Sequence, residues 1–225
     1  MSGGGALFGF SQNQVALLVV LGLLPFLMIA LTSFIKFAVV ISLLRNALGI
    51  QQIPPNIVIY SIALVMTGYI MLPTGIASGK VVMEALDKGK PVLSELQAVA
   101  EPFVDFTQRV AVRQNVEFFR DSAKRMWGEE VAREVLDPEA KPLTRLVVLM
   151  PAFIVSELTR AFQIGFLLYL PFIVIDLIVA NILLALGMSS LSPVTVSLPL
   201  KLLLFIALDG WKRLLEAMVL SYGVG

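Results

Sequence analysis

Histidine and cysteine are both absent from the 225 residues of this chain. A zinc site built on His or Cys, a Ser-His-Asp triad and a cysteine nucleophile are therefore excluded. Disulfides are excluded as well, so cysteine usage says nothing about the redox compartment. We accordingly expect no metal held by these residues and no catalysis that depends on them. We also expect no cofactor and no metal site elsewhere in the chain.

Charge is also scarce. Only 15% of the residues are charged and 58% are hydrophobic, whereas an average soluble domain is roughly 25% charged. The mean hydropathy of +0.89 is typical of a membrane protein. The net charge of +1 leaves no basic surface for nucleic acid, so we expect no nucleic-acid partner.

The few charges are concentrated in the middle of the chain. Residues 80–145 hold 23 of the 33 charged residues, 11 of them basic and 12 acidic. The chain therefore divides into an apolar N-terminal block (1–79), a polar block (80–145) and an apolar C-terminal block (146–225).

The N-terminal block contains two apolar runs. The first, about 15–44, is longer than the roughly 20 residues that a helix needs to cross a bilayer. Pro25 and Lys36 interrupt it, which predicts a kinked or partly extramembrane helix. Its first cation comes late in the run, so we expect a retained segment and not a cleaved signal peptide. The second run, about 57–77, is expected to end near Pro73.

The segment RNALGIQQIPPN at 45–56 predicts a turn between these runs. Gly49 can end a helix, and Pro54-Pro55 cannot continue one. The loop carries Arg45 and no acid, which favours the cytoplasmic side. The N-terminus and the 80–145 block would then lie outside. The residues assigned to this cytoplasmic-side turn are Arg45, Gln51, Gln52, Pro54, Pro55 and Asn56.

The polar block has a helical pattern. Its apolar residues recur at steps of three or four along 103–126, and opposite charges stand at helical spacing on the other face. A shorter segment, EEVAREVL at 129–136, ends at Asp137-Pro138. We predict a small helical hairpin packed against apolar helices, which makes the fold class all-α and membrane-protein-like.

The C-terminal block consists of an apolar run at about 146–187, a turn, and a second run at 194–208. The following segment DGWKRLLEAM has the Trp, Lys and Arg typical of a helix at a membrane interface. The expected breaks and turn residues are Pro151, Gly165, Pro171, Gly187 and Pro193.

Glu157 and Lys201 stand in mostly apolar runs on different segments. A lone charge at membrane depth costs at least about 2.5–3.5 kcal/mol, so each needs a partner. They could pair with each other, within one chain or between copies of it. Alternatively, Glu157 pairs with Arg160 three residues on, while Lys201 extends to an interface. The residues alone leave both arrangements open.

Asp176 and Asn181 lie deep in the same long run. They could form hydrogen bonds between subunits or line a water-filled space. In a small secondary transporter or channel they would form the polar site near the midplane. In a membrane aspartyl protease Asp176 would face Asp209, although the position of Asp209 at the end of a run is explained by a wet interface.

Three segments resemble a known family. SFIKFAVVISLLRNALGIQQIPPN (33–56), PAFIVSELTRAFQIGFLLYLPFIVIDLIVANILLALGM (151–188) and LSPVTVSLPLKLLLFIALDGW (191–211) are similar to signature blocks of the type III secretion export-gate proteins. This is the SctR group (YscR, HrcR, SpaP), which is related to flagellar FliP. The resemblance covers the chain outside the N-terminus and the middle block.

This resemblance implies a core subunit of an export apparatus without catalysis of its own. Such subunits form a homo-oligomeric helical ring, a pentamer, and assemble with SctS, SctT and SctU. The complex encloses the entry channel for unfolded secreted proteins. It belongs to the bacterial inner membrane, multi-pass by hydropathy, with part of its mass on the periplasmic side.

The resemblance also implies roles for individual residues. Glu157 and Lys201 match the positions of an intersubunit salt bridge. Polar groups in the apolar runs would meet neighbouring subunits or a wet lumen, and those assigned to such buried contacts are Asp176, Asn181, Arg160 and Gln163. The family's methionine gasket round the pore corresponds to Met188, Ser189 and Ser190. This chain departs from the gasket pattern, because two serines replace methionines there and seal less well.

Overall fold

The computed structural model describes residues 12–50, 53–137, 139–188 and 190–223, and within them all regular structure is helical. This confirms the all-α prediction. The elements are α1 (Gln12–Leu31), α2 (Phe34–Ala47), α3 (Asn56–Asp87), a 3₁₀ turn η2 (Val92–Glu95), α4 (Leu96–Val110), α5 (Arg113–Met126), α6 (Glu129–Leu136), α7 (Pro142–Ala185), α8 (Pro193–Ala207) and α9 (Gly210–Leu220).

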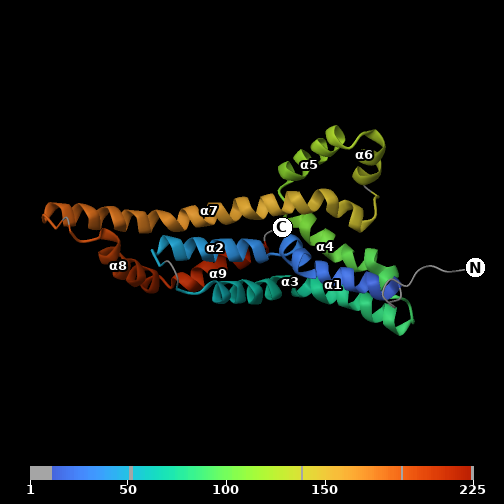
Figure 1. The fold of residues 1–225 in the computed structure, drawn as a ribbon, viewed down its shortest axis with the longest axis horizontal. Coiled ribbons are helices and arrows are strands. Elements are labelled where there is room, and N and C mark those ends of the chain that lie inside the picture. The colour runs from blue at the N-terminus through green and yellow to red at the C-terminus, as the bar shows by residue number, and fades with distance from the viewer. Residues whose placement is uncertain (1–11, 51–52, 138, 189, 224–225) are drawn as a thin grey trace, which may run out of the picture. The chain divides into compact units, whose positions relative to one another are not determined.

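The chain folds into two compact units, each drawn from two separate stretches. Unit 1 combines Met1–Thr32 with Met71–Ser156, and unit 2 combines Ser33–Ile70 with Glu157–Gly225. Helices α3 and α7 each contribute to both units (Figure 1). The units therefore do not follow the three blocks of composition.

Unit 1 buries a small apolar cluster built from α1, α4 and α7. Its buried members are Leu31, Val104, Leu146 and Leu149. The polar block supplies α4, α5 and α6, as its periodicity predicts, and α6 spans the same residues as the predicted segment 129–136. The hydroxyl of Ser156 on α7 accepts hydrogen bonds from the Val112 backbone N–H at 2.9 Å and from the Asn115 amide at 2.8 Å, which fixes the start of α5.

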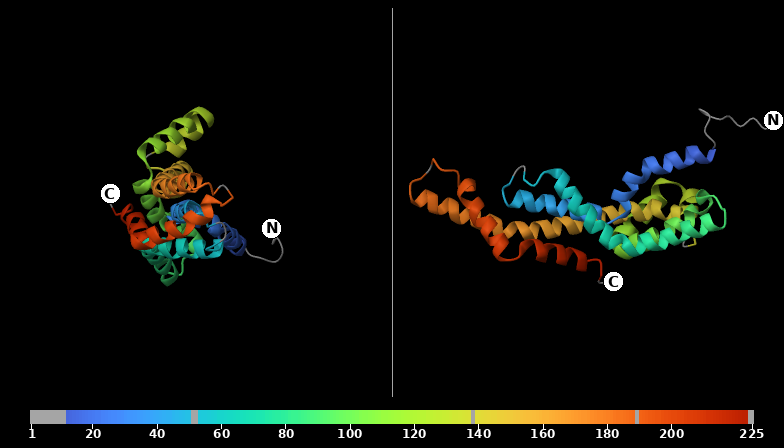
Figure 2. Two further views of the ribbon diagram at one scale, coloured as in Figure 1. Left: turned by 90° about the vertical axis from the view of Figure 1, so that its left-hand side faces the viewer. Right: turned by 90° about the horizontal axis from the view of Figure 1, so that it is seen from below.

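Unit 2 contains the larger core. The buried face of α2 repeats at helical spacing through Phe37, Val40 and Leu44, each at most 1% exposed. Within this unit the chain leaves α7, turns, and returns as α8 and α9, which Figures 1 and 2 show from different sides. The core members of this cluster are Phe37, Ala38, Val40, Leu44, Ala47, Leu48, Ala63, Ala161, Phe172, Phe205, Leu214 and Met218.

Helix α3 is longer than its apolar run. It passes through Pro73 and ends at Asp87, whereas the sequence predicts an end near Pro73. The physical reason is packing: Thr74, Ser78 and Ala85 are buried at helical spacing, and the Ser78 hydroxyl donates a 2.9 Å hydrogen bond to the Val99 carbonyl. These tertiary contacts offset the local cost of a proline inside the helix.

Helix α7 is continuous over 44 residues, although breaks are expected at three positions. Pro151, Gly165 and Pro171 all lie inside it. Gly165 serves a close contact and not a break, because a Cβ there would stand 3.2 Å from the Leu43 Cβ on α2. This agrees with the use of small residues where helices approach closely.

Within the part of the chain that the structure describes, two helices are long and apolar enough to cross a membrane. They are α3 and α7, with mean hydropathies of 1.8 and 2.4 in their most apolar windows. Up to four spans result if the α1–α2 pair and the α8–α9 pair each count as one. Helices α8 and α9 are bent by 59° at their junction, where the expected interfacial segment begins. The chain is therefore a membrane protein by the length and composition of its helices.

Candidate functional site

Two charged side chains are completely buried in unit 2. Glu157 on α7 and Lys36 on α2 are each 0% exposed, and Lys36 Nζ lies 3.4 Å from Glu157 Oε2. A buried ion pair is tolerated only when further hydrogen bonds compensate its lost hydration. The surroundings of this pair supply such bonds.

Three residues complete the shell round the Lys36–Glu157 pair. Arg160 Nη1 lies 3.3 Å from Glu157 Oε1, and the Tyr222 hydroxyl donates a hydrogen bond to Glu157 Oε2. Lys36 donates to the Ser221 hydroxyl at 2.9 Å and its Nζ lies 3.4 Å from the centroid of the Tyr222 ring. We call these five residues the Glu157 cluster. It joins α2, α7 and the residues that follow α9.

A second ion pair joins α7 to α8. Lys201 is 3% exposed, and its Nζ lies 2.7 Å from Asp176 Oδ2. Ser197, one turn earlier on α8, donates a hydrogen bond to the other carboxylate oxygen of Asp176. Lys201 also donates to the Ala47 carbonyl at 3.2 Å, where it neutralises the negative end of α2.

Within one chain, the structure does not bring Glu157 and Lys201 together as partners. Glu157 pairs with Lys36 and Arg160, and Lys201 pairs with Asp176. The alternative that Glu157 contacts Arg160 is therefore present, while Lys201 is buried and does not extend to a surface. A Glu157–Lys201 bridge between subunits stays a prediction.

Sequence reasoning missed Lys36 and Tyr222. Lys36 stands alone in an apolar run, as Glu157 does, and treating both as lone charges in need of partners would have suggested the pair. Tyr222 gave no signal, because a tyrosine beside an amphipathic helix is ordinary. Its role depends on the fold, which brings it across 65 positions to Glu157.

Hydrogen bonds from Arg45 hold the two ends of the predicted turn at 45–56 together. Arg45 Nη1 donates to the Asn56 side-chain oxygen at 2.7 Å and to the Pro54 carbonyl at 3.4 Å. Gly49, whose φ is +81°, ends α2 in a left-handed conformation. The next residue, Ile50, donates its backbone N–H to the Arg45 carbonyl. Helix α3 begins with a 2.9 Å bond from Val58 N to the Pro55 carbonyl. Gln51 and Gln52 lie outside the described residues.

The α7–α8 turn holds the residues expected at the pore. Gly187 has a φ of +72°, and the Met188 N–H donates a 2.9 Å hydrogen bond to the Leu183 carbonyl. Met188 is 42% exposed and Ser190 is also exposed. Ser189 lies outside the described residues. The turn thus presents a methionine outward from the end of a long apolar helix.

Of the other polar residues predicted on α7, Asn181 and Gln163 are exposed in the single chain. Their contacts with another subunit or a lumen stay predictions. Asp176 is held by Lys201 and Ser197, so a transport site made of Asp176 and Asn181 gains no support from the geometry. Asp209 takes a left-handed conformation with φ of +51° at the α8–α9 bend. No hydrogen bond between Asp176 and Asp209 occurs among the described residues.

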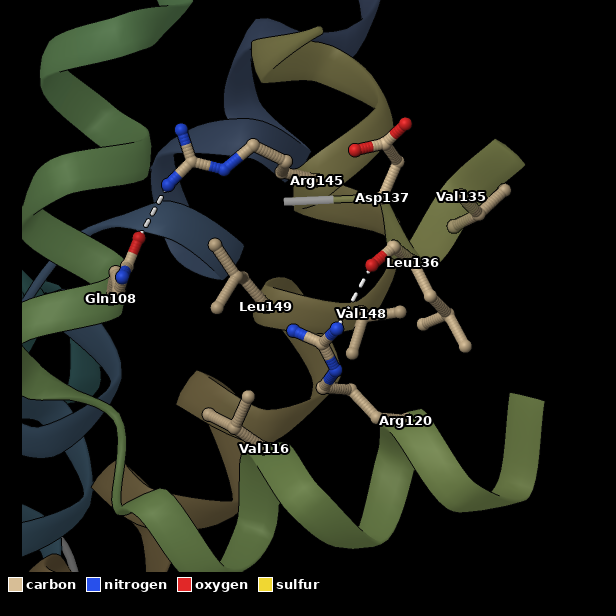
Figure 3. A pocket seen from close by; sticks show the side chains of 9 residues that line it. All are labelled: Gln108, Val116, Arg120, Val135, Leu136, Asp137, Arg145, Val148 and Leu149. Carbon is tan, nitrogen blue, oxygen red and sulfur yellow. Dashed lines mark hydrogen bonds between the residues drawn. The ribbon is translucent and has the colours of Figure 1, made fainter. Parts of the chain in front are cut away.

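Unit 1 carries a pocket of about 210 Å³ between α4, α5, α6 and α7. Figure 3 shows guanidinium groups on two of its walls. Arg120 donates to the Leu136 carbonyl at 2.8 Å, and Arg145 donates to the Gln108 side chain (Figure 3). Because these bonds tie the helices of the polar block together, we assign the pocket a structural role. Over the described residues, no group of three or more Asp or Glu side chains could hold a metal ion.

Comparison with known proteins places most of the chain in one family. The FliP family model matches residues 17–218. The chain is 47% identical to "Yop proteins translocation protein R" of Yersinia pestis over 218 residues, covering 94% of this chain and 96% of that protein. It is 45% identical to "Virulence protein YscR" of Salmonella typhimurium over 210 residues, covering 92% and 95%.

A third relative, "Surface presentation of antigens protein SpaP" of Salmonella typhi, is 40% identical over 219 residues, covering 95% and 97%. These relatives are type III secretion proteins, and the family consists of components of a secretion apparatus and not of enzymes. The resemblance seen in the sequence is thereby confirmed, and the chain belongs to the FliP family, in its type III secretion branch.

Proposed function

We propose that this chain is a pore-building subunit of a type III secretion export apparatus in a bacterial inner membrane. The observation that carries the proposal is similarity over almost the entire length of both chains: 47% identity across 94% of this chain and 96% of a Yop translocation protein. No large part of the relative lacks a counterpart here. A shared function in protein export is the simplest account of such a match.

The length of α7 supports assembly with other proteins. At 1.5 Å per residue, its 44 residues extend over about 66 Å, whereas the hydrocarbon core of a bilayer is about 30 Å thick. Large apolar side chains stay exposed along most of it, from Val147 at 50% to Leu184 at 74%, a stretch of about 55 Å. A bilayer cannot cover all of this surface, so protein partners must cover the remainder.

We infer that these partners are further copies of the chain, as a pentamer, with SctS-, SctT- and SctU-like proteins. The assembled ring would enclose the entry channel for unfolded secreted proteins. In this arrangement the 45–56 turn lies on the cytoplasmic side and the polar block on the periplasmic side. Arg45, the only charged residue of the turn, supports that orientation.

The pore constriction is assigned to the α7–α8 turn. Met188 is exposed at the end of α7 and is available to meet its copies in a ring. If it seals the channel, Met188→Ala will raise the permeability of the assembled complex to small ions, measured by dye or conductance leakage. Equal leakage by the two proteins would reduce Met188 to a packing residue.

The function is tested by complementation. The gene is expressed in a Yersinia strain that lacks its own Yop translocation protein R, and the secreted Yop proteins are measured in the medium. We expect secretion to be restored, and a Glu157→Lys variant expressed at the same level to leave it absent. In parallel, the mass of the complex extracted after co-expression with SctS- and SctT-like partners is measured. A strictly monomeric protein that restores no secretion would overturn the proposal.

A further inference from the structure

Unit 2 contains an apolar groove between α7, α8 and α9. Its volume is about 390 Å³, within the range of about 300–1,000 Å³ typical of ligand sites. Ile164, Leu168 and Phe172 line it from α7, and Leu204 and Phe205 line it from α8. Among all its lining residues, the only ionisable side chain is that of Arg213 on α9.

The groove is a consequence of the bend between α8 and α9. The helices meet at 59°, and Asp209 between them adopts a left-handed backbone. Gly210 begins α9 directly against the Phe205 ring, which a Cβ at that position would strike. The junction therefore requires a glycine, and it sets α9 at the angle that leaves the groove open.

Arg213 is exposed at the edge of this groove. Two acids lie near it on the chain, Asp209 and Glu216, yet within the described part of the chain neither forms an ion pair with it. Its hydrogen bond to Asp209 runs through the backbone, from Arg213 N to the Asp209 carbonyl at 3.1 Å. The guanidinium group of Arg213 thus lies beside the apolar groove, and Lys212, the preceding residue, is also exposed.

Trp211 lies at the same edge of the groove and indicates a membrane–water interface there. Its ring meets Phe205 edge-on, with centroids 5.6 Å apart and planes at 84°, and its side chain is 41% exposed. Tryptophan and basic residues gather where a membrane meets water. The start of α9 therefore fits the level of lipid head groups, while the apolar walls of the groove continue along α7 and α8.

We propose that the groove binds one phospholipid, with an acyl chain along α7 and α8 and its phosphate on Arg213. Guanidinium groups bind phosphate oxygens through paired hydrogen bonds, and more strongly where water is excluded. The apolar walls match a fatty chain and offer nothing to a polar ligand. This inference does not depend on the export function, because it uses only the geometry of unit 2.

Tryptophan fluorescence tests the proposal directly, because the chain has only two tryptophans. Trp127→Phe leaves Trp211 as the sole reporter; Trp127 belongs to unit 1, whereas the groove residues belong to unit 2. The full chain in mixed micelles is titrated with phosphatidylglycerol brominated on its acyl chains, which quenches tryptophan at contact. Brominated diacylglycerol, which has the same chains and no phosphate, is the control ligand.

We expect the phospholipid to quench Trp211 fluorescence in a saturable way. At the same mole fraction, diacylglycerol should quench it several-fold less. In the same background, Arg213→Gln should weaken the phospholipid effect about tenfold, the usual scale for a lost charge-assisted bond. Lys212→Gln is the matched control and should change it little, because Lys212 does not line the groove. Ala217→Phe, which fills the groove, should abolish the saturable component.

Two outcomes would overturn the proposal. Equal quenching by both ligands, unchanged in Arg213→Gln, would show that Trp211 touches bulk hydrocarbon and that no phosphate site exists. Protection of Trp211 from both ligands in an oligomeric form would show that another copy of the chain closes the groove. Circular dichroism of each variant separates these outcomes from misfolding.

Discussion

The Tyr222 hydroxyl donates a hydrogen bond to the carboxylate of Glu157, which is fully buried on α7. The ring of the same tyrosine lies against Lys36, the cation paired with that carboxylate. One side chain that follows α9 therefore stabilises both members of a buried ion pair. The charges in the apolar runs of this chain are satisfied first inside the protomer.

Tyr222→Phe separates the two contributions of this side chain. It keeps the ring over Lys36 but removes the donor to Glu157, and a hydrogen bond to a charged group contributes about 1.5–3 kcal/mol. We expect a loss of this size in the free energy of unfolding, measured with denaturant in mixed micelles. Tyr69→Phe is the control, because Tyr69 is 68% exposed and its change should stay within about 0.5 kcal/mol. Equal losses of stability in the two variants would show that the Tyr222 hydroxyl does not stabilise the buried pair.

Charge exchange distinguishes the partner of Glu157 within the chain from its predicted partner in another subunit. Glu157→Lys places a third cation beside Lys36 and Arg160, so we expect both the folded protomer and the secretion complex to be lost. Adding Lys36→Glu should restore the resistance of the protomer to denaturant, because it reverses the buried pair.

Adding Lys201→Glu to Glu157→Lys addresses the intersubunit bridge. It cannot repair the Lys36 contact and it places a second carboxylate beside Asp176, but it restores opposite charges in the predicted pair across a subunit boundary. We expect partial recovery of the oligomer, measured by native mass spectrometry of the extracted complex, without full recovery of protomer stability. If Lys36→Glu rescues protomer stability or the oligomer and Lys201→Glu rescues neither, Glu157 and Lys201 do not touch between subunits.

The second ion pair predicts unequal effects of its two neutralising substitutions. Lys201 has a side chain 4% exposed and cannot be hydrated if its partner loses charge, whereas the side chain of Asp176 is 36% exposed and can be. Asp176→Asn should therefore destabilise unit 2 more than Lys201→Met, by at least about 1 kcal/mol. Combining them should cost no more than Asp176→Asn alone. The unfolding free energies of the three variants decide this, and the reverse order would mean that Lys201 has water access.

Local patterns predicted local features of this fold. The segment 129–136 is a helix as expected, because its periodicity and its Asp137-Pro138 stop agree. The Glu157–Arg160 contact was also foreseen as one alternative, since three positions along a helix bring side chains together. The turn held by Arg45 follows from a glycine and two prolines of known conformational preference.

Contacts between distant positions could not be foreseen in the same way. Lys36 reaches Glu157 across 121 positions, and no local pattern encodes that distance. Pro73 and Pro151 were expected to end or break helices because their local cost is real, but burial along α3 and α7 outweighs it. The sequence also indicated that Glu157 and Lys201 each need a partner without indicating which one.

Gly165 offers the sharpest test of packing between α2 and α7. A Cβ there would stand 3.2 Å from the Leu43 Cβ and would strike the end of the Leu43 side chain. Gly165→Ala should therefore destabilise unit 2 by about 1–3 kcal/mol, as overpacking does, despite the better helix propensity of alanine. Gly68→Ala on α3 is the matched control, because a Cβ there meets nothing within 4 Å. That change should stabilise the helix by roughly 0.5–1 kcal/mol.

The contact itself is tested by shortening the opposing side chain. Leu43→Ala alone removes apolar contacts and should destabilise unit 2, but in the Gly165→Ala background it also removes the collision. The double variant should therefore be more stable than the sum of the two single changes predicts, by at least about 0.5–1 kcal/mol of coupling. Strict additivity would show that α2 and α7 do not approach each other at Gly165. In that case Gly165 would be an ordinary helix residue, and Gly165→Ala would stabilise the protein as Gly68→Ala does.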